Sequence, residues 1–439
     1  MTTTLRRGAL AVLFGSAILL PGLAHAGVEA ETAYVLNTFS FLVNGALVMW
    51  MAAGFTMLEA GMVRTKSVAT ICVKNVMLFS IAGIAYYLVG YNLMYDGVDG
   101  GLIGGFAPWV ADDSAVANAD FNGGYAAASD WFFQMVFVAT AASIVSGTLA
   151  ERIKLWPFLG FVVVLTAIIY PIQGAWQWGG GWLAQEGFAD FAGSTIVHSV
   201  GGWAALTGAI ILGARAGKYG PKGEIRLLPP SSLPLATLGT FILWLGWFGF
   251  NGGSQLALGS AADAVAMANI FANTGMAAAG GVVAAAVATQ LVYRKVDLTM
   301  VLNGALAGLV SITAGPDTPT IGEAIIIGGI GALIVVAGVP LLDRLKIDDV
   351  VGAIPVHLFA GIWGTMAVPL TNGEASVGVQ ALGVVAIGAF AAVASALVWF
   401  ALKVTVGLRV SADEEVAGLD QVELGMAAYP EFGRDSVTV

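Results

Sequence analysis

The sequence predicts an all-α membrane protein with eleven transmembrane helices, and three observations support this fold class. Hydrophobic residues make up 58% of the 439 positions and charged residues 10%, whereas a soluble domain is about 25% charged. The mean hydropathy is +0.85, so the chain has more apolar surface than a soluble core can bury and its solvent must be lipid. The 59 glycines suit helices that pack closely in a bilayer. Finally, lysine and arginine alternate between successive loops.

Eleven segments are long enough to cross a bilayer, which takes about 20 apolar residues in a helix. The expected spans are 34–60, 68–95, 130–150, 155–176, 193–214, 233–252, 264–293, 298–315, 321–341, 350–370 and 377–406. Lysine or arginine follows every odd-numbered span, whereas the loops after the even-numbered spans contain neither. Because basic loops stay in the cytoplasm, we expect the N-terminus outside and the C-terminal tail, 409–439, in the cytoplasm.

The first 26 residues have the pattern of a secretory signal peptide. Arg6 and Arg7 precede a short apolar run, and the segment 24–26 reads Ala-His-Ala, a small-residue cleavage site. The alternative is an uncleaved first helix, but the apolar run is short and ends at Pro21. We therefore expect cleavage after Ala26, which leaves 27–408 as the transmembrane domain of a multi-pass inner-membrane protein.

Two segments share one acid-to-histidine spacing. Residues 190–198 read DFAGSTIVH, and residues 349–357 read DVVGAIPVH. The histidines fall in spans 5 and 10, five spans apart, so their helices run in opposite directions. We expect spans 1–5, about 34–214, and spans 6–10, about 233–370, to be inverted repeats, with span 11 added at the end. Transporters built in this way hold their substrate at the midplane, so we expect His198 and His357 to meet there.

Ionisable side chains inside a membrane are costly and are functional candidates by default. The histidines lack the neighbouring glutamate and cysteine ligands of common zinc sites, so we expect no metal and no cofactor. A proton relay and a polar lining for a small neutral molecule both remain open, since a neutral imidazole offers one donor and one acceptor. Asp190 has two possible roles, accepting backbone N–H groups at the start of its helix or stabilising a cation.

Four motifs carry a resemblance to a known family. They are DFAGSTIVH, GTLAERIK (147–154), GWFGFNGGS (246–254) and DDVVGAIPVH (348–357). Together they closely resemble the ammonium transporter (Amt/Mep/Rh) family, and the resemblance covers nearly the whole chain. Ser194 departs from the family, which usually has glycine there. The resemblance implies a homotrimer with a pore through each subunit and a transporter, not an enzyme.

The resemblance also implies roles for individual residues. Trp178 and Ser254 are similar to an outer site that recruits ammonium or its analogue methylammonium, and Phe137 and Phe250 to a phenyl gate below it. The residues expected along the conduction path are Asp190, His198, His357, Trp247 and Phe133, of which the last lies in the same span as the gate.

A dry pore behind aromatic gates discriminates between two cations of similar size. Permanent charge is costly there, and ammonium escapes that cost by giving up a proton, which potassium cannot do. Whether the proton follows separately stays open, so transport is either electroneutral or electrogenic.

The alternative function is an ammonium sensor that signals through the tail. By resemblance, a PII-type signal protein docks at the tail, and no nucleic-acid partner is expected.

Overall fold

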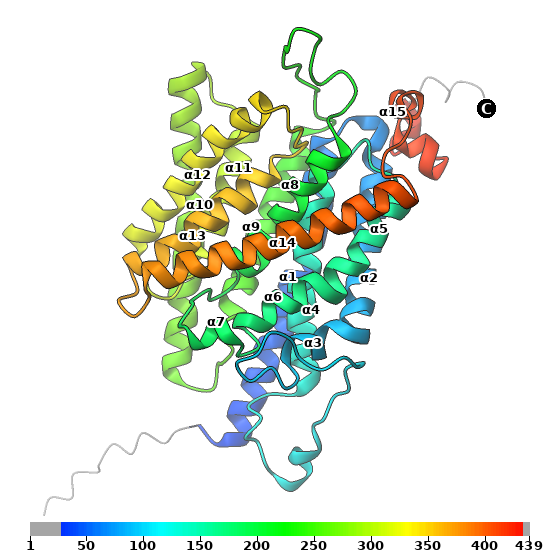
Figure 1. Ribbon diagram of the computed structural model, residues 1–439. Helices are drawn as coiled ribbons and strands as arrows, with labels where there is room; N and C mark the ends of the chain where they lie inside the picture. Colours follow the sequence, from blue (N-terminus) through cyan, green and yellow to red (C-terminus); the bar gives the residue numbers. More distant parts are fainter. Residues whose placement is uncertain (1–27, 433–439) are drawn as a thin grey trace, which may run out of the picture.

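The computed structural model describes residues 28–432, so the predicted signal peptide lies outside the described residues. Within this range the chain is helical, with two isolated β-bridges and no strand. The helices lie side by side in one bundle (Figure 1). The loop 213–232 and the C-terminal tail lie at one end of the bundle, which we call the tail side, and the long loop 96–126 lies at the other, the vestibule side.

The first part of the bundle contains eight α-helices. They are α1 (Ala30–Met62), α2 (Val68–Ala85), α3 (Tyr91–Tyr95), α4 (Ala127–Thr148), α5 (Leu155–Val164), α6 (Tyr170–Gln177), α7 (Trp182–Gln185) and α8 (Val200–Leu212). Wide π-helical turns join α2 to α3 at Tyr86–Gly90 and α5 to α6 at Leu165–Ile169, and a third, Ser194–Ser199, leads into α8.

The second part contains the remaining transmembrane helices. They are α9 (Leu233–Gly253), α10 (Ala261–Tyr293), α11 (Leu298–Ile312), α12 (Ile321–Arg344), α13 (Ala360–Ala367) and α14 (Val377–Thr405). A π-helical turn at Ile354–Phe359 leads into α13. The tail adds the short helix α15 (Ala412–Ala417) and one further wide turn at Asp420–Leu424.

The positions of the spans agree with the sequence-based expectation, although the count of eleven is not settled by length alone. Among residues 28–432, nine helical segments are long and apolar enough to cross a membrane. Two shorter apolar helices, Leu298–Ile312 and Ile354–Leu370, occupy the places of expected spans 8 and 10. The protein is an all-helical membrane protein, and eleven crossings stay a prediction.

Glycines allow the two parts of the bundle to meet closely. The helices α1 and α9 pack along each other, and the contact is lined by glycines from both. A Cβ atom at Gly61 would lie 2.4 Å from the backbone nitrogen of Ala236, and one at Gly239 would lie 2.2 Å from that of Leu58. Backbone-to-backbone contact of this kind is the packing that small residues allow in membranes.

A buried charge cluster ties the loops together at the tail side. Arg215 pairs with Asp348 at 2.8 Å and with Glu151 at 2.7 Å, and Glu151 also pairs with Arg64. Although burial raises the pKa of Asp348, the hydrogen bonds and charge of Arg215 and the charge of Arg152 outweigh it and hold that pKa well below its usual range.

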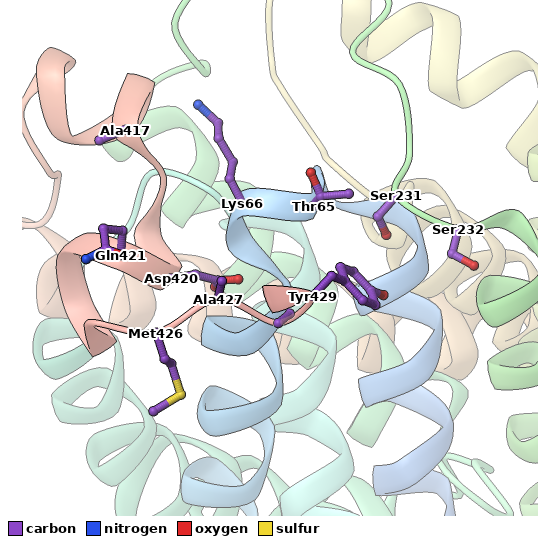
Figure 2. A pocket seen from close by; sticks show the side chains of 11 residues that line it. Thr65, Lys66, Ser231, Ser232, Ala417, Asp420, Gln421, Met426, Ala427 and Tyr429 are labelled. Carbon is purple, nitrogen blue, oxygen red and sulfur yellow. The ribbon is translucent and has the colours of Figure 1, made fainter. Parts of the chain in front are cut away.

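The tail packs against the loops of this side and does not extend away from them. Asp420 accepts hydrogen bonds from the backbone N–H groups of Ala69 (2.9 Å) and Thr70 (2.7 Å) at the start of α2. The Nζ of Lys66 donates to the carbonyl of Glu415 at 2.7 Å. A cavity of about 580 Å³ remains between the tail and the loops. Figure 2 shows the side chains that line it, among them Tyr429.

Candidate functional site

The two histidines meet inside the bundle. Their Nδ1 atoms are 3.2 Å apart, their ring centroids are 5.2 Å apart, and the ring planes differ by 23°. His198 is 0% exposed and His357 is 3% exposed. The expectation that this pair meets is therefore confirmed by the geometry, while its role in conduction stays a prediction.

Each histidine lies in a wide turn whose start is capped by its own aspartate. The carboxylate of Asp190 accepts four backbone N–H groups, those of residues 193, 194, 195 and 196, at 2.8–3.1 Å. Asp349 accepts the N–H groups of residues 352 and 354 at 3.2 and 2.7 Å, together with the hydroxyl of Thr148. Of the two possible roles of Asp190, capping is thus directly visible.

Both aspartate caps contain a glycine with a positive φ angle, and this glycine is part of the repeated aspartate-to-histidine motif. Gly193 and Gly352 each stand three residues after the aspartate, and their φ angles are +104° and +81°. Residues with a side chain rarely adopt these angles, so glycine lets the chain turn back onto the carboxylate. Each wide turn then carries its histidine, as the fifth residue of Ser194–Ser199 and as the fourth residue of Ile354–Phe359.

The two segments also contact each other reciprocally. A Cβ atom at Gly202 would lie 2.7 Å from the Cβ of Leu358, in the other histidine's turn, and one at Gly361 would lie 2.5 Å from the carbonyl oxygen of Ser194. Ser194 stands where the family usually has glycine, and its hydroxyl donates to the carbonyl of Val310 at 2.7 Å. The additional polar group is therefore hydrogen-bonded. These matched contacts fit an inverted repeat around the histidines.

Aromatic rings stack outward from the pair. The indole of Trp247 lies on His198 with ring centroids 4.9 Å apart, and its Nε1 donates to the hydroxyl of Thr313 at 2.8 Å. Phe250 is 5.3 Å from His198 and stacks on Phe137 at 4.0 Å. All of these rings are buried, so they close the path between the histidines and the vestibule side.

A cavity of about 330 Å³ opens above the phenyl pair, and Trp178, Ser254, Phe133 and Phe137 are among the residues that line it. The indole Nε1 of Trp178 donates to the carbonyl of Asp190 at 3.0 Å, which fixes the ring. The hydroxyl of Ser254 donates to the carbonyl of Phe250 at 2.8 Å. Since that proton is used inside the helix, the oxygen lone pairs remain as acceptors.

The predicted site residues therefore form one continuous column. From the vestibule inward, its members are Trp178, Ser254, Phe133, Phe137, Phe250, Trp247, His198 and His357, with Asp190 behind the first histidine.

Sequence reasoning missed one acid in this cavity. Asp130 lines it, is 8% exposed, and accepts hydrogen bonds from the hydroxyl of Tyr91 and the amide of Gln134. An acid at the first position of an otherwise apolar expected span was the available signal. A carboxylate among aromatic faces makes the cavity attractive to a cation.

Comparison with known proteins identifies the family. Residues 39–429 match the Ammonium Transporter Family. The ammonium transporter Amt2 of Archaeoglobus fulgidus is 41% identical over 423 residues, 89% of this chain and 87% of that protein. The ammonium transporter Amt2 of Haloferax mediterranei is 39% identical over 432 residues, 92% and 93% of the two chains. The chain belongs to the ammonium transporter family.

Solved structures agree with the family assignment. A protein described as a sensor Amt protein superposes with a TM-score of 0.83 at 35% identity, over 90% of this chain and 99% of that one. Mep2 of Saccharomyces cerevisiae superposes with a TM-score of 0.76 at 25% identity, over 88% and 91%. As a member of this transporter family the protein is an integral membrane protein and not an enzyme.

Proposed function

We propose that the protein transports ammonium across the inner (plasma) membrane. Ammonium is held in the cavity beside Trp178 and Ser254, gives up a proton, and crosses the phenyl pair as ammonia. The observation that carries this proposal is the buried histidine pair beneath stacked aromatic rings, because the side chains that stack along that path are phenyl, indole and imidazole rings. The names of the relatives support the same substrate.

The physical basis of selectivity is the cost of desolvating an ion. The path from Phe250 to the histidines is lined by aromatic faces and imidazoles, which compensate little of the cost of a permanent charge. The carboxylate of Asp190, behind His198, is already bonded to four backbone N–H groups. Ammonia is neutral and forms hydrogen bonds with a bare imidazole nitrogen or with an N–H. Potassium has no proton to lose, so it stops at the vestibule.

Uptake into vesicles tests this function directly. The purified protein in proteoliposomes is expected to take up methylammonium and to give it up to an excess of ammonium, whereas empty liposomes do neither. Negligible flux through a correctly folded protein contradicts the proposal.

A sensor remains the second candidate, because a protein described as a sensor superposes over most of the chain. A sensor would bind ammonium with little flux, so the same vesicle experiment separates the two.

We also propose that the protein is a homotrimer with one pore per subunit and that a PII-type signal protein is its partner at the tail side. Mass measurement in detergent and binding of purified PII protein test these two statements.

A further inference from the structure

Glu59 is a buried carboxylate inside the bundle that the proposed pathway does not yet use. It lies near the tail-side end of α1 and is 1% exposed. Its Oε2 accepts hydrogen bonds from the hydroxyl of Ser146 at 2.7 Å and from the amide of Asn75 at 3.2 Å. Among residues 28–432, its Oε1 has no hydrogen-bond partner. Leaving a buried charged oxygen without a partner is costly, so this atom requires an explanation.

A small cavity joins this carboxylate to the histidine pair. Glu59 and His357 both line a space of about 10 Å³, together with Phe55, Ser143, Asn303 and Val351. That volume holds about one water molecule. A Cβ atom at Gly147, which also lines the cavity, would lie 2.6 Å from Cγ2 of Val351 and 3.2 Å from Cγ of Glu59. Glycine at this position therefore preserves the space.

The second nitrogen of the histidine is available for this side. Nδ1 of His357 faces His198 at 3.2 Å, so Nε2 is the nitrogen that remains for a partner in the cavity that His357 lines. One water in the cavity would connect an imidazole nitrogen with a carboxylate oxygen that has no other partner among residues 28–432.

The charges around Glu59 favour a carboxylate that accepts a proton. Nζ of Lys74, on α2, donates to the backbone carbonyl of Ser146 at 2.7 Å. The hydroxyl of Ser146 in turn donates to Glu59. No ion pair between residues 28 and 432 joins Lys74 to Glu59. The lysine charge thus stabilises the ionised carboxylate from a short distance without occupying Oε1.

A second cavity lies next to the small one on the tail side. A larger cavity of about 790 Å³ opens there, and it shares Asn303 and Val351 with the small one. The amide of Asn303 donates to the carbonyl of Val351 at 3.1 Å. This side-chain hydrogen bond therefore joins two residues that line both cavities.

We infer that Glu59 accepts the proton that leaves the histidine pair toward the tail side. This inference rests on the proposed function and makes transport electrogenic. The N–H bond at Nε2 of a protonated His357 breaks while an O–H bond of the cavity water forms, and that water passes one of its protons to Glu59. The imidazole and the carboxyl group are then both neutral. The carboxyl group releases its proton to water in the larger cavity and becomes ionised again.

Substitution of Glu59 by glutamine tests this step, because the amide oxygen still accepts from Ser146 and Asn75 but cannot bind the transferred proton. In proteoliposomes, we expect E59Q to lower the current evoked by an ammonium pulse at least about tenfold, since a positioned proton acceptor contributes that much or more. The shorter acid in E59D is expected to restore at least half of the current. Glu31→Gln, the same change at an exposed position of α1, is expected to leave it unchanged.

A second pair of variants decides the matter if E59Q does not fold. Ser143 lines the cavity, and its hydroxyl donates only within its own helix, to Ala139. Ser143→Val fills the cavity and should lower the current at least about tenfold, whereas Ser143→Ala leaves room for the water and should not.

Four results separate the outcomes. An E59Q current within twofold of wild type, with the same dependence on tail-side pH, overturns the inference, as does an undiminished current in Ser143→Val. Methylammonium uptake by the wild-type protein without any current overturns the inference and leaves the proposed function intact. Absence of both uptake and current overturns the proposed function.

Discussion

His198 and His357 direct their Nδ1 atoms at each other across 3.2 Å, and both rings are buried. One Nδ1 must donate and the other accept. In the neutral pair, one Nε2 is therefore a bare acceptor and the other carries a proton, so the two ends of the pair differ. A proton that crosses the pair exchanges the two ends. This property suits a site that passes a small hydrogen-bonding molecule in one direction and a proton along the same line.

Replacing either histidine by an acid should admit potassium. A fixed carboxylate offsets part of the cost of placing a permanent cation in a dry path, so potassium no longer has to be excluded there. We expect His198→Glu proteoliposomes to show a potassium-evoked current that the wild type lacks. His357→Gln, which adds no charge, is the control and should show none. Unchanged selectivity in the acidic variant would mean that the histidines do not line the path.

Loss of the Asp190 carboxylate should abolish uptake. Four backbone N–H groups would lose their acceptor, and each buried donor left without a partner costs about 1–3 kcal/mol. We expect Asp190→Ala to remove methylammonium uptake and to lower the melting temperature. Asp297, which caps α11 with bonds to two N–H groups, supplies the control, since Asp297→Ala should retain uptake. Normal flux in a folded Asp190→Ala protein contradicts the assigned role.

The vestibule acid should strengthen ammonium recruitment. Asp130 lines the outer cavity, where a nearby charge contributes about 1 kcal/mol to holding a cation. We expect Asp130→Asn to raise the half-saturating methylammonium concentration by about fivefold, the equivalent of that energy, with little change in maximal rate. Asp112→Asn, at an exposed loop position, should change neither. An unaltered concentration dependence in Asp130→Asn would remove this acid from the recruitment site.

The tail-side charge cluster should govern stability at low pH. Removing one member of a buried ion pair costs about 3–5 kcal/mol, so Asp348→Ala should unfold at a clearly lower temperature than the exposed control Asp413→Ala. Because the pKa of Asp348 is depressed in the folded protein, its stabilisation is present above the ordinary aspartate pKa of about 3.9. It is lost as the pH falls through the lower folded value. Thermal unfolding in detergent from pH 6 down to pH 2 tests this, and equal stability of the two variants at pH 6 contradicts it.

The histidine pair could be predicted because its signal is local and repeated. The spacing from aspartate to histidine occurs twice, on helices that the loop charges place in opposite directions, and the geometry follows from that symmetry. The wide turns at Ser194–Ser199 and Ile354–Phe359 could not be predicted. A local change of helical period is visible in a sequence only when apolar and polar residues alternate with that period. These spans are apolar on all sides, so their sequence contains no such alternation.

Long-range contacts were also beyond the sequence. Asp420 caps α2 from a position 350 residues further along the chain, and no local pattern links an acid in the tail to that helix. The unpartnered oxygen of Glu59 was equally hidden, since an acid near the end of a span is usually solvated. Only the packing of α1, α2 and α4 shows that this one is buried.

The central claim is that the cargo crosses the histidine pair without its charge, and discrimination between ammonium and potassium by wild-type proteoliposomes measures it most directly. Under identical gradients, the account predicts uptake with ammonium outside and, with potassium outside, uptake at least about a hundredfold lower, a ratio that corresponds to about 2.8 kcal/mol. Comparable potassium and ammonium fluxes through the unmodified protein would contradict it.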